Sequence, residues 1–88
     1  MHEVSIIQSL LDQVERFGAE YAMNRVTRVV VRIGEETCVC EDSLQFAFAA
    51  ISRGTLVEDA ELVIERTPGR ALDLQTIEGE QEDTVGEN

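Results

Sequence analysis

The chain has 88 residues, enough for one domain with a compact core, since a chain of this size buries only about 60 to 65% of its unfolded surface. Seven arginines, no lysine and eighteen acidic residues give a net charge of -11, which opposes binding to nucleic acid and to anionic lipid surfaces. The sequence has no continuous apolar run of about 18 residues for a membrane span and no secretory signal at its Met-His-Glu start, so we expect a cytoplasmic protein.

An amphipathic helix is predicted near the start of the chain. Its apolar positions recur every three or four residues, with polar residues on the opposite side: Val4, Ile7, Leu11 and Val14. The helix is expected from about Ser5 to Tyr21 or Ala22, and Gly18 is either an internal weak point or an early stop.

A β-branched run follows this helix. Residues 25–33 (RVTRVVVRI) predict a strand that closes at Gly34, with Val29, Val31 and Ile33 on one face. We expect its arginines at 25, 28 and 32 to pair locally with acidic side chains. Residues 37–40 predict a second, short extended piece.

A second helix is predicted after this piece and should end at Gly54. Capping side chains and early negative charge precede its apolar residues: Glu41, Asp42 and Ser43 come before Leu44, Ala47, Phe48 and Ile51. Because Phe46 and Phe48 are two residues apart, one helix face cannot bury both. We favour the edge of the core for Phe46, with contact to a partner protein as the alternative.

Two more strands are predicted at residues 60–66 and 71–78, separated by a Pro68-Gly69 turn. This element order predicts an α+β fold, in which two α-helices pack on one face of a small mixed β-sheet. The acidic stretch 79–88 has one apolar residue and is expected to be a disordered tail, which leaves residues 1–78 as the domain.

The only histidine, His2, is the second residue of the chain, a position at which the amino terminus can offer three nitrogen donors to one metal ion. These are the free α-amine of Met1, the deprotonated backbone nitrogen of His2 and its imidazole, and Glu3 can add a backbone nitrogen or a carboxylate. Square-planar nitrogen donors suit Ni(II) and Cu(II), whereas magnesium and calcium prefer oxygen. A histidine at position two also occurs by chance, so this pattern alone does not establish a site.

Four segments resemble the HypA family of hydrogenase maturation factors, in order, over residues 1 to about 70: MHEVSIIQSLL, RVTRVVVRIGE, DSLQFAFAAISRGT and AELVIERTPGRA. The resemblance implies that Met1, His2 and Glu3 form a nickel site. It also implies a metallochaperone that passes Ni(II) to a [NiFe]-hydrogenase precursor or another nickel enzyme, in concert with a nickel-binding GTPase.

One departure from the family lies near Arg70 and Ala71. There the family normally inserts a zinc ribbon with two Cys-x-x-Cys pairs, whereas this chain continues directly into LDLQTIE, which resembles the family's last strand. With only two cysteines in the chain, we expect no zinc site. The deletion is natural or engineered, and the sequence does not distinguish these origins.

The second departure is the pair Cys38 and Cys40, in a loop where the family usually has small residues and an acid that is a candidate nickel ligand. Cys40 is the nearest equivalent of that acid, and a thiolate would bind Ni(II) or Cu(II) more tightly than a carboxylate. Cys38 would share its face if the segment is extended. Glu41 and Asp42 are alternative ligands, and either cysteine can instead be a small buried hydrophobe.

No phosphate-binding loop, nucleophile set or carboxylate pair indicates catalysis, so an enzyme is not expected. A HypA-like scaffold or regulatory module that no longer delivers nickel is the alternative to a metallochaperone. Missing zinc ligands favour this alternative, and the intact Met1-His2-Glu3 opposes it. A redox or copper-binding role for the cysteines would require exposed thiols.

Overall fold

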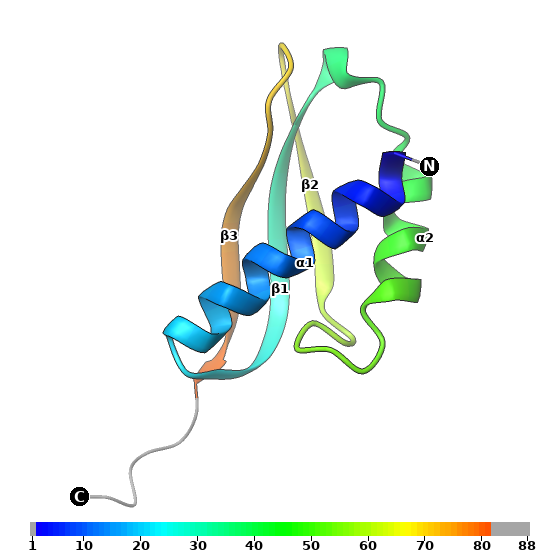
Figure 1. Ribbon diagram of the computed structural model, residues 1–88. Helices are drawn as coiled ribbons and strands as arrows, with labels where there is room; N and C mark the ends of the chain where they lie inside the picture. The colour runs from blue at the N-terminus through cyan, green and yellow to red at the C-terminus, as the bar shows by residue number, and fades with distance from the viewer. Residues whose placement is uncertain (1, 82–88) are drawn as a thin grey trace, which may run out of the picture.

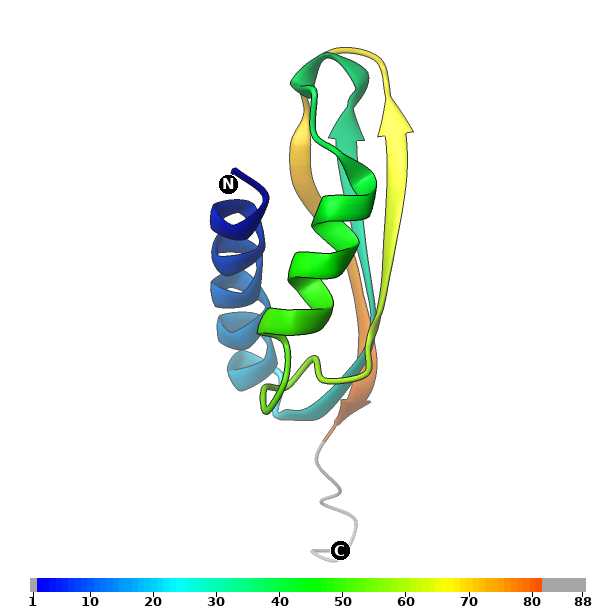
Figure 2. The same cartoon turned by 90° about the vertical axis from the view of Figure 1, so that its right-hand side faces the viewer.

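The computed structural model describes residues 2–81, with the side chain of His2 left out. The elements are α1 (His2–Glu20), β1 (Met23–Gly34), the short 3-10 helix η1 (Glu35–Thr37), α2 (Glu41–Ile51), β2 (Glu61–Thr67) and β3 (Leu72–Gln81). Figures 1 and 2 show two layers, with both helices on one face of a three-stranded sheet. The predicted α+β fold with two helices on one sheet face is confirmed.

The sheet is mixed, with the strand order β2-β1-β3. β1 pairs in parallel with β2 and antiparallel with β3, so that Val31 lies between Ile64 and Leu74. The parallel pair requires a crossover, which α2 and the loop after it provide. β1 is therefore the central strand on which the helices and both neighbouring strands assemble.

The core lies between the helices and the inner face of the sheet. Its side chains are almost all aliphatic, and seven are fully buried: Ile7, Val14, Val26, Val29, Ile33, Leu44 and Val57. The predicted inner face of β1 is confirmed, since Val29, Val31 and Ile33 all belong to this core. On the outer face, Arg28 forms ion pairs with Glu61 at 3.8 Å and Glu78 at 3.5 Å, as the local charge pairing predicted.

Helix α1 begins at His2, three residues before the predicted start at Ser5, and it continues through Gly18 to Glu20. A Cβ at position 18 would overlap the side chain of Leu56, so glycine permits the close packing of α1 against the loop before β2. The helix stops where Ala22 adopts a left-handed φ of 54°.

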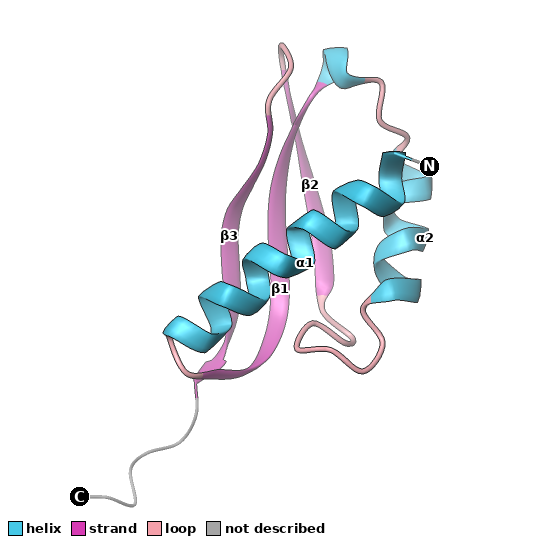
Figure 3. Cartoon of the chain, in the orientation of Figure 1, coloured by secondary structure: helices cyan, strands magenta, loops and turns pink. Residues whose placement is uncertain are grey.

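The prediction of a short extended segment at residues 37–40 is wrong. Residues 35–37 form η1, and Cys38 has a left-handed φ of 59°, so the segment is a turn followed by a loop (Figure 3). Hydrogen bonds to the β2–β3 turn impose this path, since the Gly34 N–H donates to the Ala71 carbonyl at 2.6 Å and the Glu36 N–H donates to the Gly69 carbonyl at 2.9 Å. These partners are distant in sequence, which explains why local pattern did not reveal the turn.

Residues 68–71 connect β2 directly to β3 as a tight turn, at the place where the sequence departs from the zinc-ribbon pattern. β3 continues to Gln81, three residues past the predicted boundary at Glu78, because its end is held by partners. Glu80 pairs with Arg25 at 4.0 Å, and the Gln81 side-chain amide donates to the Tyr21 carbonyl at 3.0 Å. The rest of the predicted disordered tail, residues 82–88, lies outside the described residues.

Two predictions about α2 are corrected. Cys40 is its N-cap, whereas Glu41, Asp42 and Ser43 were the expected capping residues and instead form its first turn. Phe46 was expected at the edge of the core, but 76% of its surface is exposed because the core positions of α2 are held by Leu44, Ala47 and Phe48.

Candidate metal-binding site

The start of α1 lies beside the loop that enters α2 (Figure 1). The backbone N–H of Cys40 donates a hydrogen bond to the Oε2 atom of Glu3 at 3.4 Å, across 36 intervening residues of sequence. The fold therefore brings two of the predicted site residues together, one from the chain end and one from the cysteine loop.

The Glu3 carboxylate is half-buried and hydrogen-bonded. Its own backbone N–H is the first cause of a lowered pKa, and the Cys40 N–H acts in the same direction. Both favour the charged form, so Glu3 presents an ionised oxygen donor at neutral pH. Such a group can accept hydrogen bonds or contribute an oxygen to a bound cation.

Cys40 has an extended backbone, with φ -85° and ψ 117°, and its thiol is exposed. The pKa of this thiol is lowered, chiefly by the Ser43 hydroxyl and then by the Ser43 backbone N–H, while burial and the charge of Asp42 oppose the shift. Sequence reasoning treated Ser43 as a helix cap and missed its effect on the thiol. The spacing of a cysteine three residues before a serine at a helix start was the available signal.

Cys38 is also exposed, but its left-handed backbone places it differently from Cys40. Its thiol donates to the Glu36 carbonyl at 3.9 Å, in η1. The segment is not extended, so the condition under which both thiols would share a face is not met. Exposure of both thiols contradicts the alternative that either cysteine is a buried hydrophobe.

The two alternative acidic ligands of this loop differ in their surroundings. Glu41 Oε2 lies 3.3 Å from Nη1 of Arg66, so its carboxylate already has a cationic partner. Asp42 lines the same surface hollow as Glu3, beside the start of α1. Of these two acids, Asp42 is better placed to act together with Glu3.

The amino-terminal donors are only partly described. Met1 lies outside the described residues, and of His2 the structure gives the backbone, as the first residue of α1. Within residues 2–81, apart from the His2 side chain, no group of three or more His, Cys, Asp or Glu side chains is arranged to hold a metal ion. The contact between Glu3 and Cys40 is thus the described part of the candidate site.

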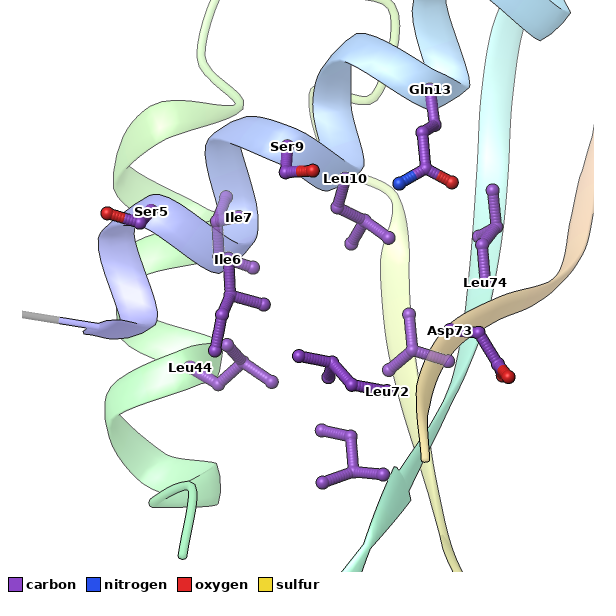
Figure 4. Close-up of a pocket in the computed structure, with 12 residues that line it drawn as sticks. Ser5, Ile6, Ile7, Ser9, Leu10, Gln13, Leu44, Leu72, Asp73 and Leu74 are labelled. Carbon is purple, nitrogen blue, oxygen red and sulfur yellow. The ribbon is translucent and has the colours of Figure 1, made fainter. Parts of the chain in front are cut away.

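A separate apolar cavity of about 260 Å³ lies between α1 and the sheet (Figure 4). Its lining is mostly aliphatic, with Leu10 and Leu44 facing Leu72 and Leu74, while Ser5, Ser9, Gln13 and Asp73 supply the polar groups. It contains no cysteine or histidine and only one carboxylate. This lining suits an apolar group rather than a metal ion.

Comparison with known proteins assigns a family to the chain. Residues 1–75 match the family model described as "Hydrogenase/urease nickel incorporation, metallochaperone, hypA". The hydrogenase maturation factor HypA of Geobacter metallireducens is 44% identical over 70 residues, which cover 80% of this chain and 61% of that protein. HypA of Archaeoglobus fulgidus is 39% identical over 74 residues, 82% of this chain and 67% of that protein.

The fold also matches a solved structure. The solution structure of the Ni metallochaperone HypA from Helicobacter pylori aligns with a TM-score of 0.78 and 20% sequence identity, covering 91% of this chain and 98% of that one. At this identity the likeness supports the fold alone. The family description is that of a metallochaperone, a protein that moves a metal rather than catalysing a reaction, in agreement with the predicted absence of enzymatic activity.

The matches leave part of the relatives' length unaccounted for, since the chain spans 61% of the Geobacter metallireducens protein and 55% of the HypA of Streptomyces avermitilis. Among the described residues, no helix is both long and apolar enough to cross a membrane. On the family match over residues 1–75 and the 44% identity to a curated HypA, the chain belongs to the HypA family of nickel-incorporation metallochaperones.

Proposed function

We propose that this chain carries Ni(II) at its amino terminus and delivers it to a [NiFe]-hydrogenase or a related nickel enzyme. The proposed nitrogen donors are the α-amine of Met1 and the backbone nitrogen and imidazole of His2, with Glu3 adjacent. Nickel is the cargo of such a protein. Moderate affinity and an exposed site then suit transfer better than a closed cage of four protein ligands.

The start of α1 at His2 supports this donor set. The first four N–H groups of a helix have no carbonyl partner within the helix, so replacing the amide proton of His2 by nickel breaks no hydrogen bond of α1. A histidine deeper in the helix would have to give up such a bond. The position of His2 therefore lowers the structural cost of metal binding through a backbone nitrogen.

The 3.4 Å contact between Glu3 and Cys40 is the observation that best supports the rest of the proposal. It brings the Cys40 backbone to the chain end that carries the nitrogen donors, and the lowered pKa of its thiol favours the thiolate that metals bind. We propose Cys40 as the fourth ligand. Cys38, whose thiol contacts the Glu36 carbonyl, is the second candidate, and Asp42 or Glu3 would supply an oxygen instead.

The proposed partners are the nickel-binding GTPase of hydrogenase maturation and the precursor of the hydrogenase large subunit, both in the cytoplasm. The net charge of -11 favours partners with a basic face and opposes nucleic acid and anionic membranes. We further propose that the domain works without zinc, since the chain has two cysteines and the turn at residues 68–71 joins β2 directly to β3.

Titration of the untagged apo-protein with Ni(II), followed by absorption spectroscopy, tests this function. One equivalent should bind, with the absorption of a square-planar Ni(II) complex. A tag fused to the amino terminus, or the substitution His2→Ala, should abolish this binding because each removes a donor. The same tag at the carboxyl terminus is the matched control and should leave binding intact. Equal affinity of all four proteins would show that the site is elsewhere, and absence of binding by the untagged parent would favour the scaffold alternative.

A further inference from the structure

Cys38 and Cys40 are exposed thiols separated by one residue, and they are the two cysteines of the chain. Both are free and lie in the loop between η1 and α2, where the sequence departs from its family. Oxidants react with a cysteine whose sulfur is accessible to solvent. The structure thus meets the condition that a redox role sets, namely two accessible thiols close together in the chain.

The spacing of the two cysteines places them within reach of a disulfide. The Cα atoms of residues two apart are at most about 7 Å from each other, and disulfides join Cα atoms about 4.4 to 6.8 Å apart. A small bend at Val39, which is half-buried, is therefore sufficient to bring the pair into bonding range. The Cys38 thiol can rotate toward Cys40, since its contact with the Glu36 carbonyl, at 3.9 Å, is a weak hydrogen bond.

The loop around the pair is held by groups other than the two sulfur atoms. The backbone N–H of Cys40 donates to Glu3 at 3.4 Å, and the Cys40 carbonyl accepts a hydrogen bond from the Leu44 N–H at 3.0 Å. Val39 packs against the core. Joining the sulfurs consequently leaves the loop attached to α1 and α2, and the chemical change is confined to the two thiols.

Resting on the nickel site proposed above, we propose that Cys38 and Cys40 form a reversible redox pair through which a peroxide weakens nickel binding. The Cys40 thiolate attacks hydrogen peroxide, so that the O–O bond breaks, Cys40 becomes a sulfenic acid and hydroxide leaves. The Cys38 thiol then attacks this sulfur: the S–S bond forms, the S–O bond breaks, and the thiol proton leaves with the hydroxyl group as water. Overall, two thiols and one hydrogen peroxide yield one disulfide and two waters.

The position of Cys40 favours it as the attacking thiol. It is the N-cap of α2, where the N–H groups of the first helical turn have no carbonyl partner within the helix and stabilise a thiolate. Cys38 lies outside the helix, before this turn. Cys38 is therefore assigned as the thiol that closes the disulfide.

The resulting disulfide is readily reversed. A disulfide between residues two apart closes a small, strained ring, and both of these cysteines are exposed. Strained or exposed disulfides are the ones that thiols reduce easily. Two molecules of glutathione therefore return the pair to two thiols and become glutathione disulfide. In a reducing environment the thiols persist, and oxidation is confined to exposure to peroxide.

Oxidation acts on the candidate metal site through Cys40. A sulfur atom in a disulfide carries no negative charge and no longer offers the thiolate that we propose as the fourth ligand. The nitrogen donors of Met1 and His2 are unchanged by this reaction. Nickel binding is consequently weakened rather than abolished.

The first measurement treats the reduced, metal-free, untagged chain with one equivalent of hydrogen peroxide. Both thiols should be lost to Ellman's reagent, the intact mass of the monomer should fall by two hydrogen atoms, and glutathione should restore both thiols. In Cys38→Ser the reaction should stop at Cys40, as a sulfenic acid that dimedone traps. Retention of both thiols by the parent, or a disulfide-linked dimer as its main product, would overturn the redox pair.

The second measurement compares the Ni(II) affinity of the reduced and the oxidised chain. Oxidation should weaken it at least about tenfold, the smallest loss usual when a metal site is disturbed. Reduction, followed by removal of glutathione, should restore it. The double variant Cys38→Ser with Cys40→Ser is the matched control, and its affinity should not respond to peroxide, which excludes oxidation of Met1 or His2 as the cause.

Equal affinity of the reduced and oxidised parent, or an equal loss in the double variant, would overturn the effect on nickel. Absence of nickel binding by the reduced parent would instead count against the function proposed above. The thiol count and the mass are measured without metal, so they decide on the redox pair in either case.

Discussion

Cys40 and Glu3 are joined by a single hydrogen bond of 3.4 Å, from the backbone N–H that opens α2 to the carboxylate near the start of α1. The bond uses the backbone of Cys40, so it leaves the thiol available for other partners. A substitution of the Cys40 side chain should consequently affect metal binding without detaching the loop from the helix.

Because the backbone of Cys40 makes the contact with Glu3 and its thiol does not, the effect of replacing each cysteine on metal binding can be predicted. The Ni(II) complex of the parent should show a sulfur-to-metal charge-transfer band, and Cys40→Ser should remove it and weaken binding, because a hydroxyl is a poorer ligand than a thiolate. Cys38→Ser is the matched control and should keep the band. Loss of the band only in the double variant would mean that the thiols substitute for one another. A spectrum and affinity unchanged by the double substitution would show that neither thiol binds nickel. The ligands would then be the nitrogen donors, and an oxygen atom would be the remaining candidate for the fourth ligand.

The lowered pKa of Glu3 predicts a dependence of stability on pH in the apo-protein. A carboxyl whose folded pKa lies below its unfolded value stabilises the fold above the unfolded pKa, and this contribution is lost as pH falls through the folded pKa. The parent should therefore be more stable than Glu3→Gln at neutral pH, and the difference should shrink in acid. Urea denaturation of both proteins at pH 7 and in acid measures this, and Glu15→Gln, another acid on α1, serves as the control. A constant difference between parent and Glu3→Gln at both pH values would refute the linkage.

Gly34 is predicted to tolerate substitution poorly. A Cβ there would overlap the Gly69 carbonyl and push β1 from the β2–β3 turn, weakening two backbone hydrogen bonds. Overpacking of about 1–3 kcal/mol, with about 1 kcal/mol for each of the two weakened bonds, gives a loss of about 3–5 kcal/mol for Gly34→Ala. Gly54→Ala is the control: its φ is +74° but no atom lies within 4 Å of the new Cβ, so only backbone strain of about 1–2 kcal/mol applies. Equal losses of unfolding free energy in the two variants would contradict this account.

Removal of metal should leave the fold intact. The core is aliphatic and continuous through both helices and all three strands, so no metal ion is needed to hold the described elements together. Far-ultraviolet circular dichroism and cooperative unfolding should be the same before and after treatment with EDTA. Metal analysis of the purified protein provides the control for complete removal. Loss of cooperative unfolding after chelation would indicate a structural metal.

The helices and long strands were predictable because their apolar periodicity reflects the faces that they bury. Val29, Val31 and Ile33 alternate as an inner strand face should, and Ile7, Leu11 and Val14 follow helical spacing. The loop at Cys38 was not predictable in this way. Its path depends on hydrogen bonds from the end of β1 to Gly69 and Ala71, which local propensity does not encode.

In the candidate site, too, some features were predictable from the local sequence and others depend on contacts between distant residues. The nitrogen donors at Met1 and His2 follow from position in the chain, and their assignment to nickel remains a prediction. The proximity of Cys40 to Glu3 was implied only by resemblance to a family, since two side chains so far apart in sequence have no common period. Phe46 was expected at the edge of the core but is exposed, because hydrophobicity alone does not show whether a side chain at the border of a helix face is covered by the core.

The direct turn at residues 68–71 also bears on the speed of folding. β3 must find β1, its antiparallel partner, after α2 and β2 have been added between them, and closing such a loop costs conformational entropy. Each doubling of loop length adds about 0.6 kcal/mol to this cost. Only four residues separate β2 from β3. Once β2 has paired with one edge of β1, this short connection holds β3 close to the other edge of β1. The second pairing therefore follows the first with little additional search, and both edges of the sheet should form in one kinetic step.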